Sequence, residues 1–231
     1  MGHKRRGYNR DTPRDLVRDY KLFAIACEGG KREPGYFNVF QHLSSKIKVD
    51  LIDNYVTDDE MFRKHETNSA PKWVLDRAMR YIEKNDLKDE DDLWFVIDKD
   101  RWSDTQIREL ASYCESYANW HIVISNPCFE VWLYFHKKAN ILASKSSSCN
   151  DFKHEISGFE KGGYHPLKFI VDFQKAVENA KGNDSDVNYF MPKERETKVY
   201  QLGEAIISQV SKPDIIEFIN VTIPRLIKSS Q

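Results

Sequence analysis

The sequence predicts an α/β fold: a mostly parallel β-sheet flanked by helices, with a helical C-terminal extension. Two observations carry this prediction. Over residues 21–142, short apolar runs alternate with amphipathic helical patterns, which is the order of elements in parallel sheets built from βαβ units. After residue 142 no comparable run of β-forming residues occurs, and the apolar residues recur at helical spacing.

Residues 93–97, Leu-Trp-Phe-Val-Ile, give the strongest strand signal of the chain. An uninterrupted apolar run of aromatic and β-branched residues between charged residues is typical of a strand buried on both faces. The run stops at Asp98 and Asp100, two acids separated by one residue. Open α/β sheets bind ligands at the carboxyl ends of their strands. Both carboxylates are therefore expected where a ligand binds.

The elements before this run predict a first α/β unit. Residues 22–27 form another short apolar run that ends at Glu28-Gly29-Gly30, and a helical pattern follows over residues 34–46. The glycine turn has neither the G-x-G-x-x-G spacing nor a Gly-Lys-Ser/Thr ending, so we expect no phosphate loop there. Residues 47–56 alternate loosely, which predicts a strand nearer the sheet edge, followed by a polar loop to residue 68.

Helices are expected on both sides of the central run. Proline at position 71 is typical of a first helical turn, and an apolar face continues from there to Asn85. After the central strand, Ser103 and Gln106 have the spacing of a capping box. The helix that they open is expected to face the core with Ile107, Leu110, Ala111 and Cys114.

Residues 121–124 predict the next strand. Ser125-Asn126-Pro127 follows, which predicts an N-cap and a proline in the first turn of a helix over residues 128–136. Glu130 would then lie one turn into this helix, where the helix dipole favours an acid. His136 is expected to interact with the dipole at the helix end rather than to act as a base or a ligand.

The chain is expected to have three parts. Residues 1–20 form a basic flexible arm, residues 21–142 the α/β catalytic domain, and residues 143–231 a mainly helical region packed on it. The serine-rich residues 143–150 have linker composition. Helices are expected beyond them over residues 167–180, 199–210 and 215–227.

Composition narrows the class of protein. Of the 231 residues, 31% are charged, yet the formal net charge is −1. The overall charge therefore gives no indication of a protein that binds nucleic acid or a membrane surface through its net charge. No stretch approaches the roughly 20 apolar residues of a membrane span, and the basic start lacks the apolar region of a signal peptide. We therefore expect a cytoplasmic protein. The four cysteines form no Cys-x-x-Cys pair, which argues against a zinc ribbon and a disulfide framework.

Acids follow several of the predicted strands. Glu28 comes after the first strand, Asp98 and Asp100 after the central strand, and Glu130 shortly after the fourth. Parallel strands end at one edge of a sheet, so these carboxylates are expected to converge there. Oxygen ligands suit Mg²⁺ or Mn²⁺, and a nearby Glu can serve as general acid or base in phosphoryl chemistry. The alternatives are a solvated turn carboxylate for Glu28 and a dipole partner for Glu130.

The chain also resembles the RloB family, which includes the AbiLii abortive-infection proteins. The resemblance spans about residues 20–205, and the Ser-Asn-Pro-Cys-Phe-Glu-x-Trp segment is its most specific part. The motifs that carry it are Cys27-Glu28-Gly29 with Tyr36-Phe37, Val96-Ile97-Asp98-Lys99-Asp100, Ser125-Asn126-Pro127-Cys128-Phe129-Glu130-Val131-Trp132-Leu133 with His136, and Pro192 with Thr197-Lys198-Val199-Tyr200-Gln201-Leu202.

The resemblance implies a Toprim-type domain in a bacterial antiphage setting, often encoded beside an ATPase partner. In the Toprim pattern, the Glu after the first strand acts as acid or base and the Asp-x-Asp binds Mg²⁺. This implies an acid/base role for Glu28 and metal binding by Asp98 and Asp100, and it leaves open whether Glu28 is also a metal ligand. The usual Thr-Glu after the glycine turn is Arg32-Glu33 here. The usual Tyr-x-Lys is Phe159-Glu160-Lys161, which makes Lys161 a candidate site residue.

The function expected from these features is a divalent-metal-dependent nuclease acting on DNA or RNA in antiphage defence, with an ATPase partner. The alternatives are a non-catalytic module that binds an ATPase or nucleic acid, and a nucleotidyl transferase with the same acids. Contacts with nucleic acid are expected from polar and basic residues near the acids, namely Lys31, Arg32, Lys99, Arg101 and Asn126.

Overall fold

The computed structural model describes residues 19–52, 71–85, 87–100 and 102–229. In this part of the chain, four parallel strands form one sheet in the order β2-β1-β3-β4. The predicted α/β fold is confirmed, and β2 lies at the sheet edge as expected. The strands are β1 (Lys21–Cys27), β2 (Ile47–Leu51), β3 (Asp92–Asp98) and β4 (Trp120–Ser125).

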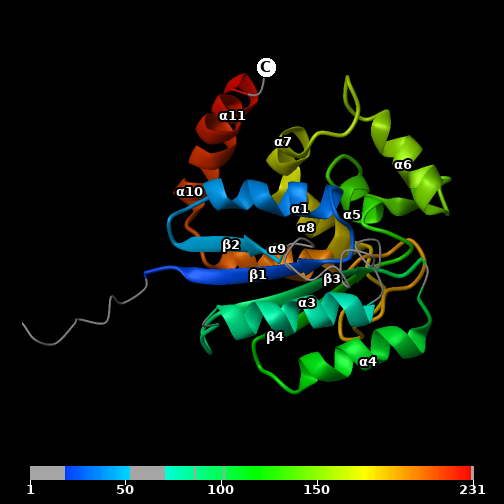
Figure 1. The fold of residues 1–231 in the computed structure, drawn as a ribbon. Coiled ribbons are helices and arrows are strands. Elements are labelled where there is room, and N and C mark those ends of the chain that lie inside the picture. The colour runs from blue at the N-terminus through cyan, green and yellow to red at the C-terminus, as the bar shows by residue number, and fades with distance from the viewer. Residues whose placement is uncertain (1–18, 53–70, 86, 101, 230–231) are drawn as a thin grey trace, which may run out of the picture.

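Helices cover both faces of this sheet (Figure 1). On one face, α3 (Pro71–Lys84) and α4 (Asp104–Glu115) pack in one apolar cluster with Leu93, Phe95 and Ile97 of β3. On the other face, α1 (Arg32–Phe37), α5 (Glu130–Phe135) and the C-terminal helices form a second cluster with Trp94 and Val96. Alternate side chains of β3 thus enter different clusters, which confirms a strand buried on both faces.

The chain after residue 142 is helical, as predicted. Its helices belong to the same apolar cluster as β1 and α5. A Cβ atom at Gly203 would lie 2.5 Å from Cγ2 of Val177, so glycine allows α8 and α9 to pack closely. The elements are α6 (Cys149–Ser157), α7 (Pro166–Phe169), α8 (Phe173–Gly182), α9 (Val199–Ser208), α10 (Lys212–Glu217) and α11 (Ile223–Ser229).

Several predicted helices are shorter or divided. The helix expected over residues 34–46 begins at Arg32 and ends at Phe37, and a 3₁₀ turn (Asn38–His42) continues it. The helix expected over residues 167–180 is divided by a 3₁₀ turn (Ile170–Asp172). A π-helical turn (Phe218–Thr222) joins α10 to α11, where one helix was expected. A further 3₁₀ turn covers Ile141–Ala143.

The predicted N-cap at Ser125-Asn126-Pro127 is wrong. The Asn126–Pro127 peptide bond is cis, and α5 begins only at Glu130. The polar groups expected to cap the helix bind elsewhere: Ser125 Oγ shares a hydrogen bond with Thr197 Oγ1 at 2.8 Å, and Asn126 Nδ2 donates to Pro192 O at 3.1 Å. Glu130 is therefore the first residue of its helix. The capping box of Ser103 and Gln106 is confirmed.

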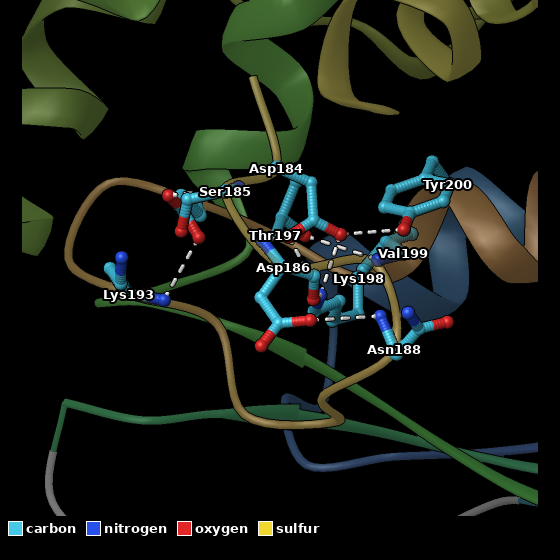
Figure 2. A network of polar contacts seen from close by, with 10 residues as sticks. Asp184, Ser185, Asp186, Asn188, Lys193, Thr197, Lys198, Val199 and Tyr200 are labelled. Carbon is cyan, nitrogen blue, oxygen red and sulfur yellow. Dashed lines mark hydrogen bonds and ion pairs between the residues drawn. The ribbon is translucent and has the colours of Figure 1, made fainter. Parts of the chain in front are cut away.

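A buried ion pair fixes the loop before α9 (Figure 2). Lys198 Nζ lies 2.5 Å from Asp184 Oδ2, and both side chains are 1% exposed. Tyr200 donates to the same oxygen at 2.6 Å, and the backbone N–H of Lys198 donates to Ile124 O at 2.8 Å. The ion pair thus joins residues 184 and 198, and the backbone bond of Lys198 attaches this loop to the carboxyl end of β4.

Three features expected from the sequence lie outside the described residues. They are the basic arm up to residue 18, the end of the expected edge strand (residues 53–56) with the polar loop that follows it to residue 68, and Arg101. In the part of the chain that the structure describes, no helix has the length and apolar character needed to cross a membrane.

Candidate acid site at the carboxyl edge of the sheet

The ends of β1 and β3 lie side by side at the topological switch point of the sheet. Cys27 pairs with Val96, and the backbone N–H of Glu28 donates to Val96 O at 2.9 Å. The helix after β1 packs on one face of the sheet and the helix after β3 on the other, and such a switch point is where open α/β sheets bind ligands. Glu28 follows β1 and Asp98 ends β3, so both acids lie at this point.

The Glu28 carboxylate is buried and held by two N–H groups. Its Oε2 accepts from the backbone N–H of Asp98 at 2.9 Å, and its Oε1 accepts from Trp102 Nε1 at 2.9 Å. The pKa of Glu28 is raised to about 7, mainly by burial; the two hydrogen bonds oppose this shift, and the negative charges of Asp100 and Glu33 add to it. Glu28 therefore changes charge near neutral pH.

Asp98 and Asp100 occupy different environments. Burial raises the pKa of Asp98 well above its usual value, and nearby carboxylates add to the shift, with Glu33 the largest contributor. Asp100 is exposed; its backbone N–H donates to Pro127 O at 3.0 Å, and its Oδ2 accepts from Cys149 Sγ at 3.4 Å. The repulsion that raises the pKa of Asp98 is what a bound cation would relieve.

Glu33, from α1, adds another buried acid. Its carboxylate lies over Gly29, where a Cβ atom would approach Glu33 Oε2 to 2.1 Å, so glycine leaves the space that this carboxylate occupies. Burial raises the pKa of Glu33, and the charge of Glu130 adds to the shift. The positive charges of Arg32 and Lys153 act in the opposite direction.

Glu130 reaches the same region from the start of α5. Its side chain is buried and forms an ion pair with Arg32. The guanidinium of Arg32 also lies over the ring of Tyr164, at 5.3 Å from the ring centroid. Arg32 is thus partly exposed and held by one acid and one ring, and the nucleic-acid contact expected for it stays a prediction.

The chemistry of these donors suits a hard cation, because carboxylate oxygens are the ligands that Mg²⁺ and Mn²⁺ prefer. The described side chains nevertheless contain no group of three or more His, Cys, Asp or Glu placed to hold a metal ion. Mg²⁺ is commonly bound by one or two carboxylates, with water and substrate phosphate as the other ligands. Asp98 and Asp100 supply that number of carboxylates.

The other predicted contact residues lie in varied surroundings. Lys31 is exposed, and Lys99 Nζ lies 2.9 Å from Asp104 Oδ1. Asn126 and Lys99 line a cavity beside Asp100. Lys161 is exposed, and its carbonyl accepts a hydrogen bond from Lys168 Nζ at 2.7 Å.

Besides Glu33, three residues of the site were not expected from the sequence. Trp102 binds Glu28, Arg77 of α3 donates from Nη2 to Cys27 O at 2.6 Å, and Lys153 of α6 lines the cavity beside Asp100. Of these three residues, only Trp102 could have been suspected from the sequence. It is a tryptophan in a polar loop, and the N–H of a partly buried indole needs a hydrogen-bond partner. Arg77 and Lys153 lie on helix patterns that carry no sign of the site.

His136 is part of the core rather than a charged partner of the helix dipole. Its Nδ1 lies 3.1 Å from Trp132 O and its Nε2 lies 2.9 Å from the Tyr36 hydroxyl. Burial lowers the pKa of His136 to about 3, so the ring is neutral at neutral pH. A carbonyl only accepts, so Nδ1 carries the proton and Nε2 accepts from Tyr36. His136 therefore contacts the carboxyl end of its helix as a neutral hydrogen-bond donor and not as a positive charge.

The fold and the site together define a class: an α/β protein that gathers carboxylates at the switch point of a parallel sheet. The family model described as RloB-like protein matches residues 23–206, which is most of the chain. The protein belongs to the RloB-like family, as the resemblance of its motifs predicted. Neither a curated protein nor a solved structure matches the chain.

Proposed function

We infer that this protein is a divalent-metal-dependent nuclease that cleaves phosphodiester bonds of DNA or RNA in a bacterial antiphage defence system, acting with an ATPase partner. The observation that carries the proposal is the position of Glu28 beside Asp98 at the switch point, with Asp100 two residues further on. In the Toprim pattern that RloB resemblance implies, these are the positions of the acid/base glutamate and the metal-binding Asp-x-Asp.

Asp98 and Asp100 are the proposed metal ligands. Their carboxylates follow β3 at the edge where open sheets bind ligands, and neighbouring acids raise the pKa of Asp98. Mg²⁺ or Mn²⁺ would neutralise phosphate charge there and lower the pKa of an attacking water.

Glu28 is the proposed general acid or base. Both of its oxygens accept hydrogen bonds from N–H groups, which favours a proton-transfer role over metal ligation. Its pKa of about 7 suits the task, because a catalytic group works best when its pKa lies near the operating pH.

A non-catalytic module that binds an ATPase or nucleic acid is the alternative. The lack of a three-ligand metal group among the described side chains favours it, as does the pairing of Glu130 with Arg32. The raised pKa values of Glu28 and Asp98 favour the enzyme, since a binding surface does not require such buried carboxylates.

The test is incubation of the purified protein with plasmid, tRNA and total RNA in Mg²⁺, Mn²⁺ or EDTA, with and without the ATPase encoded beside it. Asp98→Asn is expected to abolish divalent-dependent cleavage without lowering the melting temperature, because it removes a carboxylate from a mutually repelling group. Asp89→Asn is the matched control, since Asp89 is an exposed acid that precedes β3 at the opposite edge of the sheet.

Glu28→Gln separates the possible roles of Glu28. General acid/base catalysis predicts a loss of turnover of about 10²- to 10⁴-fold with Mn²⁺ affinity retained. Loss of both would instead make Glu28 a metal ligand, and loss of neither would make it a turn carboxylate. Wild-type cleavage by Asp98→Asn, or no cleavage under any condition tried, would refute the nuclease proposal.

A further inference from the structure

A cavity of about 630 Å³ opens beside Asp100, on the side of α6. Figure 1 shows α6 beyond the end of the sheet where the strands terminate. This volume lies within the range of roughly 300 to 1,000 Å³ that is usual for ligand sites. Its charged lining consists of Lys99 and Lys153 with the acids Asp100 and Glu194.

The lining is polar and contains no aromatic ring among the described residues. Hydroxyl and amide groups come from Ser147, Ser148, Asn126 and Asn150. Serine, asparagine and lysine side chains are common partners of phosphate and sugar oxygens, whereas sequence-tolerant binding through the bases uses aromatic stacking platforms. The cavity is therefore suited to the backbone of a nucleic-acid strand rather than to its bases.

Lys153 is the cation that the cavity offers. Lys99 is paired with Asp104, whereas the exposed ammonium of Lys153 has no carboxylate partner among the described residues. Lys153 lines the cavity, and its positive charge lowers the pKa of Glu33, a member of the acid cluster.

We propose that this cavity binds the sugar-phosphate backbone next to the scissile phosphate, and that Lys153 contacts a phosphate there. The proposal rests on the proposed function for the position of the reacting phosphate. It gives the phosphate contact to Lys153 rather than to Lys161, the candidate site residue that the family resemblance implies. Because the contacts are to the backbone, binding is expected to depend on salt and to be nearly independent of base sequence.

The test measures binding of labelled single-stranded homopolymers of each base to the full-length Glu28→Gln protein in Mg²⁺, across a series of salt concentrations. Adding Lys153→Met is expected to weaken binding about equally for all bases and to reduce the slope of log affinity against log salt by roughly 0.7 to 1. Lys145→Met is the matched control, because Lys145 is an exposed lysine in the same segment that does not line the cavity. Lys161→Met tests the competing assignment.

Each outcome is decisive. A reduced slope for Lys153→Met but not for Lys145→Met supports the cavity, and it does so even if the wild type cleaves nothing and the nuclease proposal fails. An unchanged slope for Lys153→Met overturns the cavity assignment, as does a loss confined to Lys161→Met or an absence of binding by the parent protein. If the wild type cleaves nucleic acid and Lys153→Met has an unchanged slope, the cavity assignment fails and the nuclease proposal is retained.

Discussion

Trp102 Nε1 donates a hydrogen bond to Glu28 Oε1 at 2.9 Å, from the loop that follows the Asp98–Asp100 pair. The other carboxylate oxygen of Glu28 accepts from the backbone N–H of Asp98. Both donors come from β3 and the loop after it, and they fix the orientation of a carboxylate at the end of β1. Both bonds stabilise the charged form, so they limit a pKa that burial raises.

Trp102→Phe is expected to shift the pH dependence of cleavage. The change keeps a ring and removes the N–H donor, so the pKa of Glu28 rises by about one unit, given the usual strength of a hydrogen bond to a charged group. The limb of the pH–rate profile that reports Glu28 then moves to higher pH; this is the acidic limb for a general base and the basic limb for a general acid. Trp94→Phe is the control, because the indole N–H of Trp94 has no hydrogen-bond partner among the described residues. Superimposable profiles of wild type and Trp102→Phe would contradict the role assigned to this bond.

Glu28 is also expected to make stability depend on pH in the absence of metal. Its folded-state pKa of about 7 lies above its ordinary value of 4.5, so the folded protein binds more protons than the unfolded chain between these values. Stability therefore falls as pH rises through this window, by up to about 3 kcal/mol for Glu28. Glu28→Gln cannot lose a proton and is expected to lack this part of the fall.

Urea unfolding in EDTA at about pH 5 and about pH 8 measures the effect as the difference between the two free energies of unfolding. Asp89→Asn, which removes an exposed acid, is expected to behave as the wild type. If Glu28→Gln loses as much stability as the wild type between the two pH values, Glu28 is not the buried titrating group described above.

The convergence of Glu28 with Asp98 could be predicted because it depends on features that the sequence displays. The buried runs that become β1 and β3 are apolar enough to identify alone, and helical patterns between them require parallel strands. Strands of one direction end at one edge, so acids at their ends meet. The same reasoning predicted that Glu130 lies near these acids, although its helix begins later than expected.

The remaining parts of the site depend on contacts between segments far apart in the chain. Asn126 has the sequence context of an N-cap, but its amide binds Pro192 and its backbone binds residues 195 and 196. The local preference for a cap was thus overridden by a tertiary contact. Lys153 is brought to the cavity by the docking of α6, which no local pattern near Asp100 indicates.

The serine-rich residues 143–150 are expected to resist proteolysis, although their linker composition predicts an early cut. The hydroxyls of Ser144 and Ser146 donate to Glu155 Oε2 at 2.5 and 2.7 Å, and Arg195 donates to Ser144 O at 2.6 Å. Glu155→Ala removes the shared acceptor, so trypsin should cut after Lys145 sooner than in the wild type. Glu178→Ala, at an exposed acid of α8, is the control. Early cleavage of the wild type after Lys145 would show that these bonds do not hold the segment.

The buried pair of Lys198 and Asp184 gives the last prediction. Lys198→Met leaves the Asp184 carboxylate buried with the Tyr200 hydroxyl beside it, and an uncompensated buried charge destabilises a protein by about 3 to 5 kcal/mol. The double change Lys198→Met with Asp184→Asn removes both charges and is expected to destabilise less than Lys198→Met alone, which urea unfolding of the two variants measures. Lys193→Met, which removes an exposed lysine of the same loop, should leave the free energy of unfolding within about 0.5 kcal/mol of the wild type. A double variant no more stable than Lys198→Met would mean that packing of the lysine stem, and not pairing of the charges, holds this loop on β4.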